Sequence, residues 1–350
     1  MPKVPDARFT LPDRTLTRGG VVDLLSGVVR ARPLSGDEAL RELERITALA
    51  RAGNNDARCE LAYHLLANPA GSTVNRRILL LVRPAAAAGH REGLYLLGLL
   101  TLRGQGLKQN LEAGAALITR AALAGQLDAQ KLLAKLYTEG LGVAADPARA
   151  LYWQRLAGAA GDAASAREAG MAYVRGQGTA ADRTQGRYWL EKAASGADSR
   201  AAFELSRLMR GEDSPAGPRD AQFWLREAAI TGTLDAQFRL GLQYWSGQGT
   251  KVNLREALRW TCRAAEGGSA SAIATLSGFF LSGNILPISR FNAYVLALAA
   301  EKRGQSTARL TRESLEPVLT YREKRRARHL LRVTPDIREL VEILVPRNER

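Results

Sequence analysis

The sequence predicts an all-α fold made of about seven stacked helix-turn-helix repeats of 36 residues, with capping helices at the ends. Three observations support this prediction: a helix-favouring composition, a glycine that recurs at a fixed interval, and apolar residues that keep the same interval. Of the 350 residues, 46% are hydrophobic but only 6% are aromatic. Alanine and leucine supply most of the apolar side chains, and both lose little entropy in a helix. No segment shows the apolar-polar alternation typical of a strand.

The recurring glycine follows each alanine-rich segment. Successive copies are 36 residues apart, with one interval of 35, at Gly53, Gly89, Gly125, Gly161, Gly196, Gly232, Gly268 and Gly304. Regularity of this kind is typical of stacked repeats, in which neighbouring copies bury each other's apolar faces. Because glycine often ends α-helices, we expect each copy to stop the second helix of a repeat.

Two apolar columns keep the same period. In each repeat a first helix is predicted where a leucine is followed by a small residue and then by a bulky one, as in Leu133, Ala134 and Tyr137. That spacing defines one helical face, and the small residue lets a neighbouring helix come close. The predicted second helices carry four of the five tryptophans, seven or eight residues before the stop glycine, at Trp153, Trp189, Trp224 and Trp260.

A pair of glycines separates the two helices in several repeats, at positions 104/106, 140/142, 176/178 and 247/249. Asn110, Asp146, Asp182 and Asn253 follow these pairs, and such side chains cap helices by accepting bonds from free backbone N–H groups. Pro147 then occupies the favoured first helical position. A phosphate-binding loop would need a preceding strand and either a Gly-Lys-Ser/Thr sequence or a third glycine, and the sequence has none of these. We therefore interpret the pairs as turns.

The segments "KLLAKLYTEGLGVAADPARALYWQRLAGAAG" (131–161) and "FRLGLQYWSGQGTKVNLREALRWTCRAAEGG" (238–268) resemble the Sel-1-like repeat, a relative of the tetratricopeptide repeat. The resemblance covers about 54–304, although the copies at 56–89, 198–232 and 270–304 lack the glycine pair. It implies a right-handed superhelical α-solenoid that binds a partner protein or peptide in its concave groove. It carries over no catalytic residue and implies no cofactor, so we expect a non-enzymatic scaffold or adaptor of bacterial type.

We therefore expect three regions. Residues 1–34 form an N-terminal extension that is partly extended, and residues 305–350 form C-terminal capping helices with a basic patch. The solenoid occupies 35–304, with a half-repeat at 35–53 and repeats that end near 89, 125, 161, 196, 232, 268 and 304.

Residues with catalytic or metal-binding chemistry are sparse. The three histidines, His64, His90 and His329, lie on different repeats and share no ligand spacing. Cys59 and Cys262 are too far apart along a solenoid to meet, so we expect two buried reduced thiols. No hydrolase, zinc-protease or nucleotide-binding motif occurs. We therefore predict no enzyme activity and no metal site.

The candidate partner-binding residues lie outside the repeat columns. The run "YREKRRARHLLR" (321–332) is the densest basic cluster and offers Arg322, Arg325, Arg326 and Arg328. The patch suits an acidic partner, nucleic acid or lipid headgroups, or it is simply a solvated helix face. Trp245 and Arg210 occupy one column that is not part of the repeat framework. Trp245 either lines a groove or packs under a neighbouring loop.

Two alternatives to the scaffold hypothesis remain. The net charge of +15 fits a basic solenoid that binds nucleic acid, or an arginine-biased genome; only Tyr321 offers base stacking beside the basic run. The start has no apolar leader and no stretch could span a membrane, so we expect a cytoplasmic protein. A periplasmic adaptor for exopolysaccharide or secretion machinery would require an export signal upstream of this sequence. The sequence leaves the partner's identity and the oligomeric state open.

Overall fold

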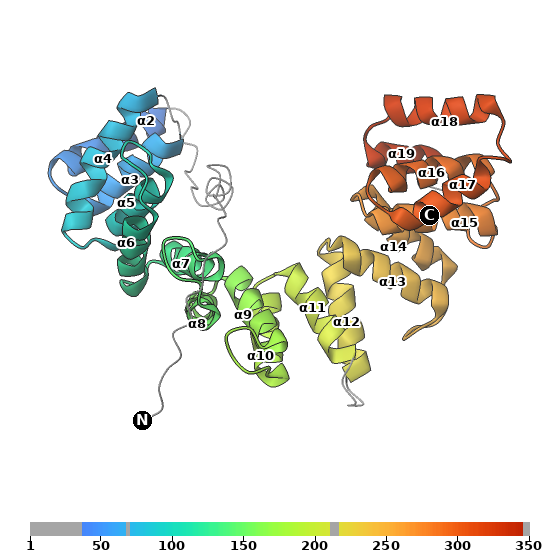
Figure 1. The fold of residues 1–350 in the computed structure, drawn as a ribbon, viewed down its shortest axis with the longest axis horizontal. Coiled ribbons are helices and arrows are strands. Elements are labelled where there is room, and N and C mark those ends of the chain that lie inside the picture. The colour runs from blue at the N-terminus through green and yellow to red at the C-terminus, as the bar shows by residue number, and fades with distance from the viewer. Residues whose placement is uncertain (1–36, 68–70, 211–216, 346–350) are drawn as a thin grey trace, which may run out of the picture. The chain divides into compact units, whose positions relative to one another are not determined.

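The computed structural model describes residues 37–67, 71–210 and 217–345, and the predicted extension at 1–34 lies outside them. These residues form helices and no strand, which confirms the all-α prediction (Figure 1). The helices are α2 (Asp37–Arg51), α3 (Asn55–Ala67), α4 (Gly71–Ala87), α5 (Arg91–Arg103), α6 (Leu111–Leu123), α7 (Leu127–Glu139), α8 (Pro147–Ala159), α9 (Ala163–Arg175), α10 (Arg183–Ser195), α11 (Ser199–Arg210), α12 (Gly217–Ile230), α13 (Leu234–Ser246), α14 (Leu254–Glu266), α15 (Ala270–Ser282), α16 (Arg290–Lys302), α17 (Ser306–Leu315), α18 (Tyr321–Val333) and α19 (Ile337–Leu344).

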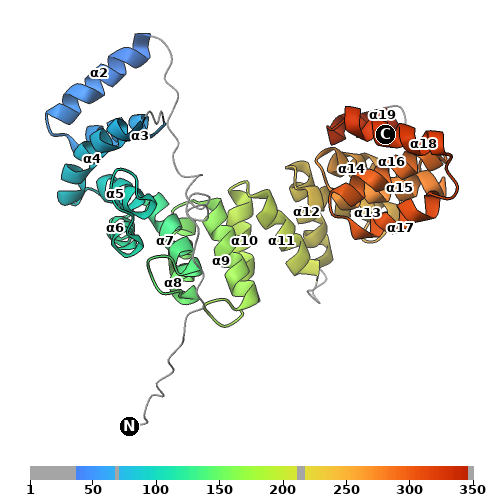
Figure 2. The ribbon, with the colours of Figure 1, turned by 45° about the horizontal axis from the view of Figure 1, so that its top comes forward.

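The helices from α3 to α16 form seven pairs, each made of a first and a second helix, while α2 precedes them and α17 to α19 follow. The chain divides into two compact units, which we describe separately. The first unit spans residues 1–160 and 177–179, and the second spans 161–176 and 180–350. Within each unit, helices that follow one another in sequence from α2 to α17 lie side by side, whereas α18 packs against α16 and α19 against α14 (Figures 1 and 2).

The turn glycines have two different roles. The first glycine of a pair ends the first helix in a left-handed conformation, as at Gly140 with φ 70°. The second glycine allows a close approach. A Cβ on Gly142 would collide with the backbone oxygen of Leu111, where the preceding second helix begins. The same collision would arise between Gly178 and the Pro147 oxygen. The pair therefore ends one helix and packs the turn against the previous repeat.

The predicted helix caps are confirmed. The Asp146 side chain accepts hydrogen bonds from the backbone N–H groups of Ala148 and Arg149, both at 3.0 Å. Asn110, Asp182 and Asn253 each accept one bond from the residue three positions later. A polar side chain at this position satisfies N–H groups that have no partner within the helix.

The stop glycines follow the expected pattern with one exception. Gly125, Gly161, Gly232 and Gly268 have φ values of 79°, 102°, 102° and 97°. Gly196 differs, with φ −82°, and Ala197 with φ 63° takes the left-handed position instead. Gly196 has another requirement, because a Cβ there would lie 2.9 Å from the Ala163 Cβ.

Each unit's core lies between paired helices. A Cβ on Gly98 would lie 2.7 Å from Ile118, and one on Gly241 would lie 2.6 Å from the Thr261 hydroxyl. The small residue of the first helix therefore permits close packing of the second helix, as the sequence predicts. Trp153, Trp189 and Trp260 are only 6 to 7% exposed, and Trp224 is partly buried. At the C-terminal end, α19 closes the core with Leu340, Val341 and Leu344.

Candidate functional site

A groove of about 1340 Å³ crosses the first helices α9, α11, α13 and α15 of the second unit. We call it the first-helix groove. Its apolar floor includes Phe203, Phe238 and Leu242, and Arg175, Arg200 and Arg239 also line it. The groove therefore combines aromatic surface with guanidinium groups, the two side-chain types that most often dominate binding energy at protein interfaces.

Some of the groove's cations are neutralised and others are not. Arg167 pairs with Asp198 at 3.0 Å, and Arg207 pairs with Glu204 at 3.0 Å. Arg175, Arg200 and Arg239 make no ion pair with any residue in the described ranges. The Arg239 guanidinium instead lies 5.4 Å from the centre of the Phe203 ring. Among the described residues, five arginines and three acidic residues, Glu168, Glu204 and Asp235, line the groove, so it carries an excess of positive charge.

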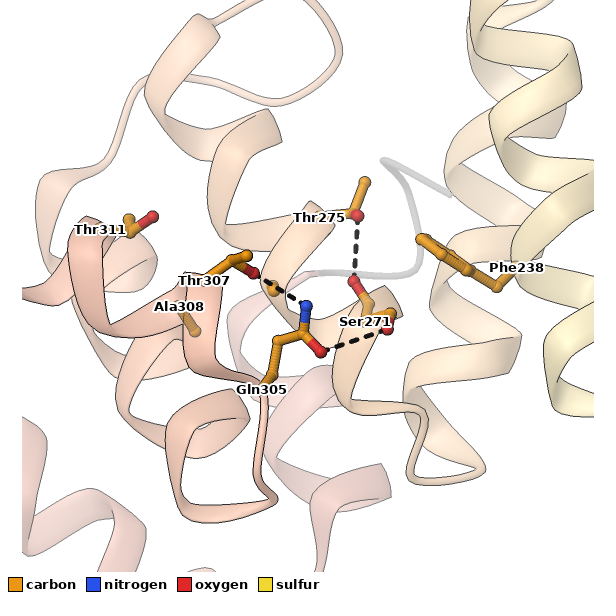
Figure 3. Close-up of a pocket in the computed structure, with 8 residues that line it drawn as sticks. Phe238, Ser271, Thr275, Gln305, Thr307, Ala308 and Thr311 are labelled. Atoms are coloured by element: carbon orange, nitrogen blue, oxygen red, sulfur yellow. Dashed lines mark hydrogen bonds between the residues drawn. The ribbon is translucent and has the colours of Figure 1, made fainter.

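A smaller hollow of about 320 Å³ adjoins the groove and shares Phe238 and Ser271 with it (Figure 3). Its other lining groups are mostly hydroxyls and amides. Gln305 donates to the Thr307 hydroxyl at 2.8 Å and lies 3.4 Å from the Ser271 hydroxyl. The lined surface therefore changes from basic and aromatic over α11 and α13 to neutral and polar over α15 and α17.

The residues singled out from sequence do not themselves line the first-helix groove. Arg210 lies near the groove residues Arg207 and Arg239; partial desolvation, together with the charges of Arg239 and Arg207, lowers the pKa of its guanidinium. Trp245 is 46% exposed and its ring lies 6.4 Å from that of Phe279. The groove's lining, as far as the described residues show it, includes neither side chain.

Sequence reasoning missed Phe203 and Phe238, although a signal for them exists. Both occupy the position two residues before the leucine column of the first helix, marked here by Leu205 and Leu240. Other repeats place residues as different as Lys131 or Arg167 there. The residue at this position borders the groove, and the Phe203 ring is at the same time part of the buried core.

The structure brings the basic residues of α18 together. Five arginines and one histidine line a hollow of about 690 Å³: Arg322, Arg325, Arg326, Arg328, His329 and Arg332. Arg326 lies over the Phe291 ring of α16, 5.2 Å from its centre, which ties that side chain to the core. Leu330 and Leu331 pack against the core on the other side of the helix.

One cluster in the first unit is arranged like a catalytic triad, with a thiol, an imidazole and a carboxylate in contact in that order. His90 Nδ1 lies 3.6 Å from the Cys59 sulfur, and His90 Nε2 lies 3.0 Å from the Asp56 carboxylate. Burial raises the pKa of Cys59 to about 12, and the negative charges of Glu92 and Asp56 add to the increase. The thiolate is the reactive form of cysteine. A protonated thiol that is 1% exposed therefore cannot serve as a nucleophile here.

No helix in the described part of the chain is long and apolar enough to cross a membrane. No curated protein sequence is significantly similar to the chain. A Sel1 repeat protein from Oxalobacter formigenes is similar in structure, with a TM-score of 0.56 and 24% identity, over 72% of this chain and 98% of that one. This likeness shows the fold.

Two other solved structures align at lower scores. The protective antigen c5321 of uropathogenic Escherichia coli, which displays an SLR fold, has a TM-score of 0.33 and 20% identity over 85% of this chain and 96% of its own. The immunity protein Pa5087 of Pseudomonas aeruginosa has a TM-score of 0.34 and 18% identity over 64% and 81%.

The family comparison agrees with the helix pairs. The Sel1 repeat matches five consecutive segments, at 91–126, 127–162, 163–198, 199–230 and 234–269. Four of the five are 36 residues long, and each contains one complete first and second helix. Together they span half of the sequence, so the chain belongs to the Sel1 repeat family.

Proposed function

We propose that this chain is a non-catalytic protein-interaction module that binds an acidic, aromatic-containing segment of a partner protein in the first-helix groove. One observation carries the proposal: three arginines that pair with no carboxylate of the described residues stand in a single groove beside Phe238, which is partly exposed, and Phe203, which is buried under the Arg239 guanidinium. Sel1 repeats generally serve as protein-interaction scaffolds.

The composition of the groove determines which segment would fit. Phe238, which is partly exposed, offers apolar contact area for a partner side chain, and aromatic pairs contribute beyond simple burial. Arg200 and Arg239 can each hold a carboxylate through two parallel hydrogen bonds. A partner segment with alternating acidic and apolar residues would satisfy both kinds of group. The polar hollow over α15 and α17 would accept backbone or amide groups further along the segment.

The proposal that the chain is non-catalytic is supported by the properties of the Cys59, His90 and Asp56 cluster. This cluster is the described arrangement that comes nearest to a catalytic group, and its thiol is buried and has a raised pKa. Its hydrogen bonds connect the first helices α3 and α5. We therefore assign the cluster a structural role.

The proposal can be tested by site-specific photo-cross-linking. The photoreactive residue p-benzoylphenylalanine replaces Phe238 in the groove, and Phe223 in a matched control. Phe223 is a phenylalanine on the second helix α12 of the same unit and is 55% exposed. We expect a discrete cross-linked protein in the source cells with the Phe238 variant and none with the Phe223 variant.

Two arginine substitutions test the charge requirement. Arg200→Glu combined with Arg239→Glu should abolish the cross-link at position 238, because carboxylates would repel an acidic segment. The outer-face pair Arg255→Glu and Arg259→Glu on α14 changes the net charge equally and should leave the cross-link intact. Equal cross-linking at both phenylalanines, or equal loss with both charge reversals, would refute groove recognition.

A further inference from the structure

We propose that the exposed face of α18 is a docking surface for a membrane that carries anionic phospholipids. The face consists of Arg322, Arg325, Arg326, Arg328, His329 and Arg332, and we call it the α18 basic face. It is separate from the first-helix groove, so this inference does not depend on the proposed function.

The α18 basic face is held in place by the opposite side of the same helix. Ala327 is fully buried, and Leu330 and Leu331 pack against the core of the second unit. The Thr320 side chain and Glu323 cap the helix reciprocally. Figure 1 shows α18 along an outer edge of the C-terminal helices. The apolar side is occupied by the protein itself, so contact with a membrane would be electrostatic and superficial.

The positive charges of this face are not neutralised from within. Among the described residues, its lining includes no acidic side chain. The nearby acidic groups are already occupied: Glu323 accepts bonds from Thr320, and Glu316 pairs with Arg312 at 2.6 Å. Lys324 is also engaged, since it donates to the Glu316 backbone oxygen at 3.0 Å. Arg322, Arg325 and Arg328 make no ion pair within the described ranges and are exposed.

The chemistry of the face favours phosphate groups over a polypeptide. Guanidinium groups bind phosphate oxygens through paired hydrogen bonds. A protein interface normally has an apolar centre with aromatic anchors, whereas the described residues that line this hollow are all arginine or histidine. The ligand must therefore offer dense negative charge without an apolar side chain, as an array of phosphates does.

The surroundings of the face favour a lipid surface over nucleic acid. The described lining of the hollow contains no aromatic ring, Arg326 already covers the Phe291 ring, and Tyr321 is a single ring beside Arg325 and Arg328. Single-strand binding instead uses several rings on which successive bases stack. Exposed apolar side chains instead flank the two ends of the helix: Tyr321 is 76% exposed, Val318 51% and Val333 57%. Tyrosine suits the boundary between headgroups and acyl chains. Clusters of four to eight basic residues on a helix are typical of anionic-lipid binding.

The test is co-sedimentation of the full chain with phospholipid vesicles. Phosphatidylglycerol vesicles are compared with phosphatidylcholine vesicles at low and high salt. We expect binding to the anionic vesicles alone, and weaker binding as salt screens the charges. The triple variant Arg322→Gln, Arg325→Gln, Arg328→Gln should bind roughly a hundredfold more weakly, since each basic residue near an anionic surface contributes a several-fold gain in partitioning.

A matched triple variant controls for net charge. Arg76, Arg77 and Arg83 are three exposed arginines on the single helix α4 of the first unit, and changing them to glutamine removes the same charge. This variant should bind the anionic vesicles as the unmodified chain does. Equal binding to both lipids, or equal loss in both triple variants, would overturn the proposal.

A competition experiment with DNA tests whether the face binds nucleic acid instead. If a DNA oligonucleotide binds the face and displaces the anionic vesicles, the face is a nucleic-acid site and the membrane proposal is wrong. Circular dichroism and thermal unfolding should be the same for both triple variants, so that a loss of binding is not a loss of folding. The cross-link at Phe238 is a separate readout and tests the groove alone.

Discussion

At the scale of single residues, Ala197 occupies a conformation that suits glycine. Its φ is 63°, and its side chain is exposed. A left-handed conformation costs a residue with a Cβ about 1–2 kcal/mol relative to glycine. We therefore expect Ala197→Gly to stabilise the protein by about 1 kcal/mol, partly offset by the greater freedom of glycine in the unfolded chain. Thermal unfolding measures the change, and a lower melting temperature would contradict it.

Two glycines have nearly the same φ, so substituting each with alanine distinguishes the cost of the backbone conformation from the cost of a steric collision. Gly125 has φ 79° and no atom within 4 Å of the place a Cβ would take, whereas Gly142 has φ 70° and a Cβ there would strike the Leu111 oxygen. Gly125→Ala should cost about 1 kcal/mol of unfolding free energy. Gly142→Ala should cost about 3 kcal/mol, because the turn must also move. Urea unfolding compares them, and equal costs would mean that the turn moves freely.

The buried thiol and phenols of the first unit make its stability depend on pH. Burial raises the pKa of Cys59 from 9.0 to about 12, and burial also raises the pKa of Tyr63 and of Tyr95 above 10.0. These groups lose their protons more readily in the unfolded state. The contribution of these groups to stability should therefore be constant below pH 9 and be lost as the pH rises from 9 towards 12, by up to about 1.4 kcal/mol per pH unit for each group.

Urea unfolding at pH 7 to 11 measures this dependence. Cys59→Ala removes one of the three groups, so its stability should fall less steeply above pH 9. A constant stability up to pH 11 in the unmodified chain would contradict the assignment.

At the scale of helices, three polar contacts connect the start of one helix to the first turn of the helix two before it, at a constant separation. His90 contacts Asp56, Gln126 contacts Glu92, and Gln305 contacts Ser271, in each case 34 residues apart. The first member of each pair begins its helix, and the second lies in the first turn of the earlier helix. These contacts set the spacing of first helices within each unit.

The Arg167–Asp198 pair is the corresponding link between α9 and α11. Its side chains are 19% and 13% exposed, and Asp198 also accepts a hydrogen bond from the Ala201 N–H. Asp198→Asn retains the cap and removes the charge, so it should cost about 1 kcal/mol. Asp198→Ala removes both and should cost about 2 kcal/mol. Thermal unfolding measures both. The control is Glu256→Gln, which removes the charge of a half-buried Glu256 paired with the exposed Arg259 and should cost under about 0.5 kcal/mol.

The sequence predicts local elements better than it predicts surfaces. The caps at Asp146 and Asn253 and the turn glycines could be predicted because their function depends on neighbours a few residues away. The groove aromatics Phe203 and Phe238 could be recognised only as members of a variable column, since a helix position becomes a groove wall only through the helices placed beside it. The replacement of Gly196 by Ala197 in the left-handed position was also missed, although the single interval of 35 residues marks it.

At the scale of the whole molecule, contacts in a repeat array are mostly between neighbours, so distant repeats need not unfold together. Two reporters can follow the two units separately. In the background Trp153→Phe with Cys262→Ala, all four remaining tryptophans lie in the second unit and the one thiol, Cys59, lies in the first. Adding Gly142→Ala should lower the urea midpoint of Cys59 labelling more than the midpoint of tryptophan fluorescence. Equal shifts would show that the chain unfolds as one cooperative unit.

The contact between each turn and the previous second helix also has a genetic consequence. The second glycine of a pair meets the same part of the preceding repeat at both Gly142 and Gly178. Deleting or duplicating the DNA of one whole repeat would therefore bring together a turn and a second helix that already fit each other. Deleting or duplicating part of a repeat would not. The gene can thus lengthen or shorten its protein in steps of 36 codons, with each step adding or removing one segment of binding surface.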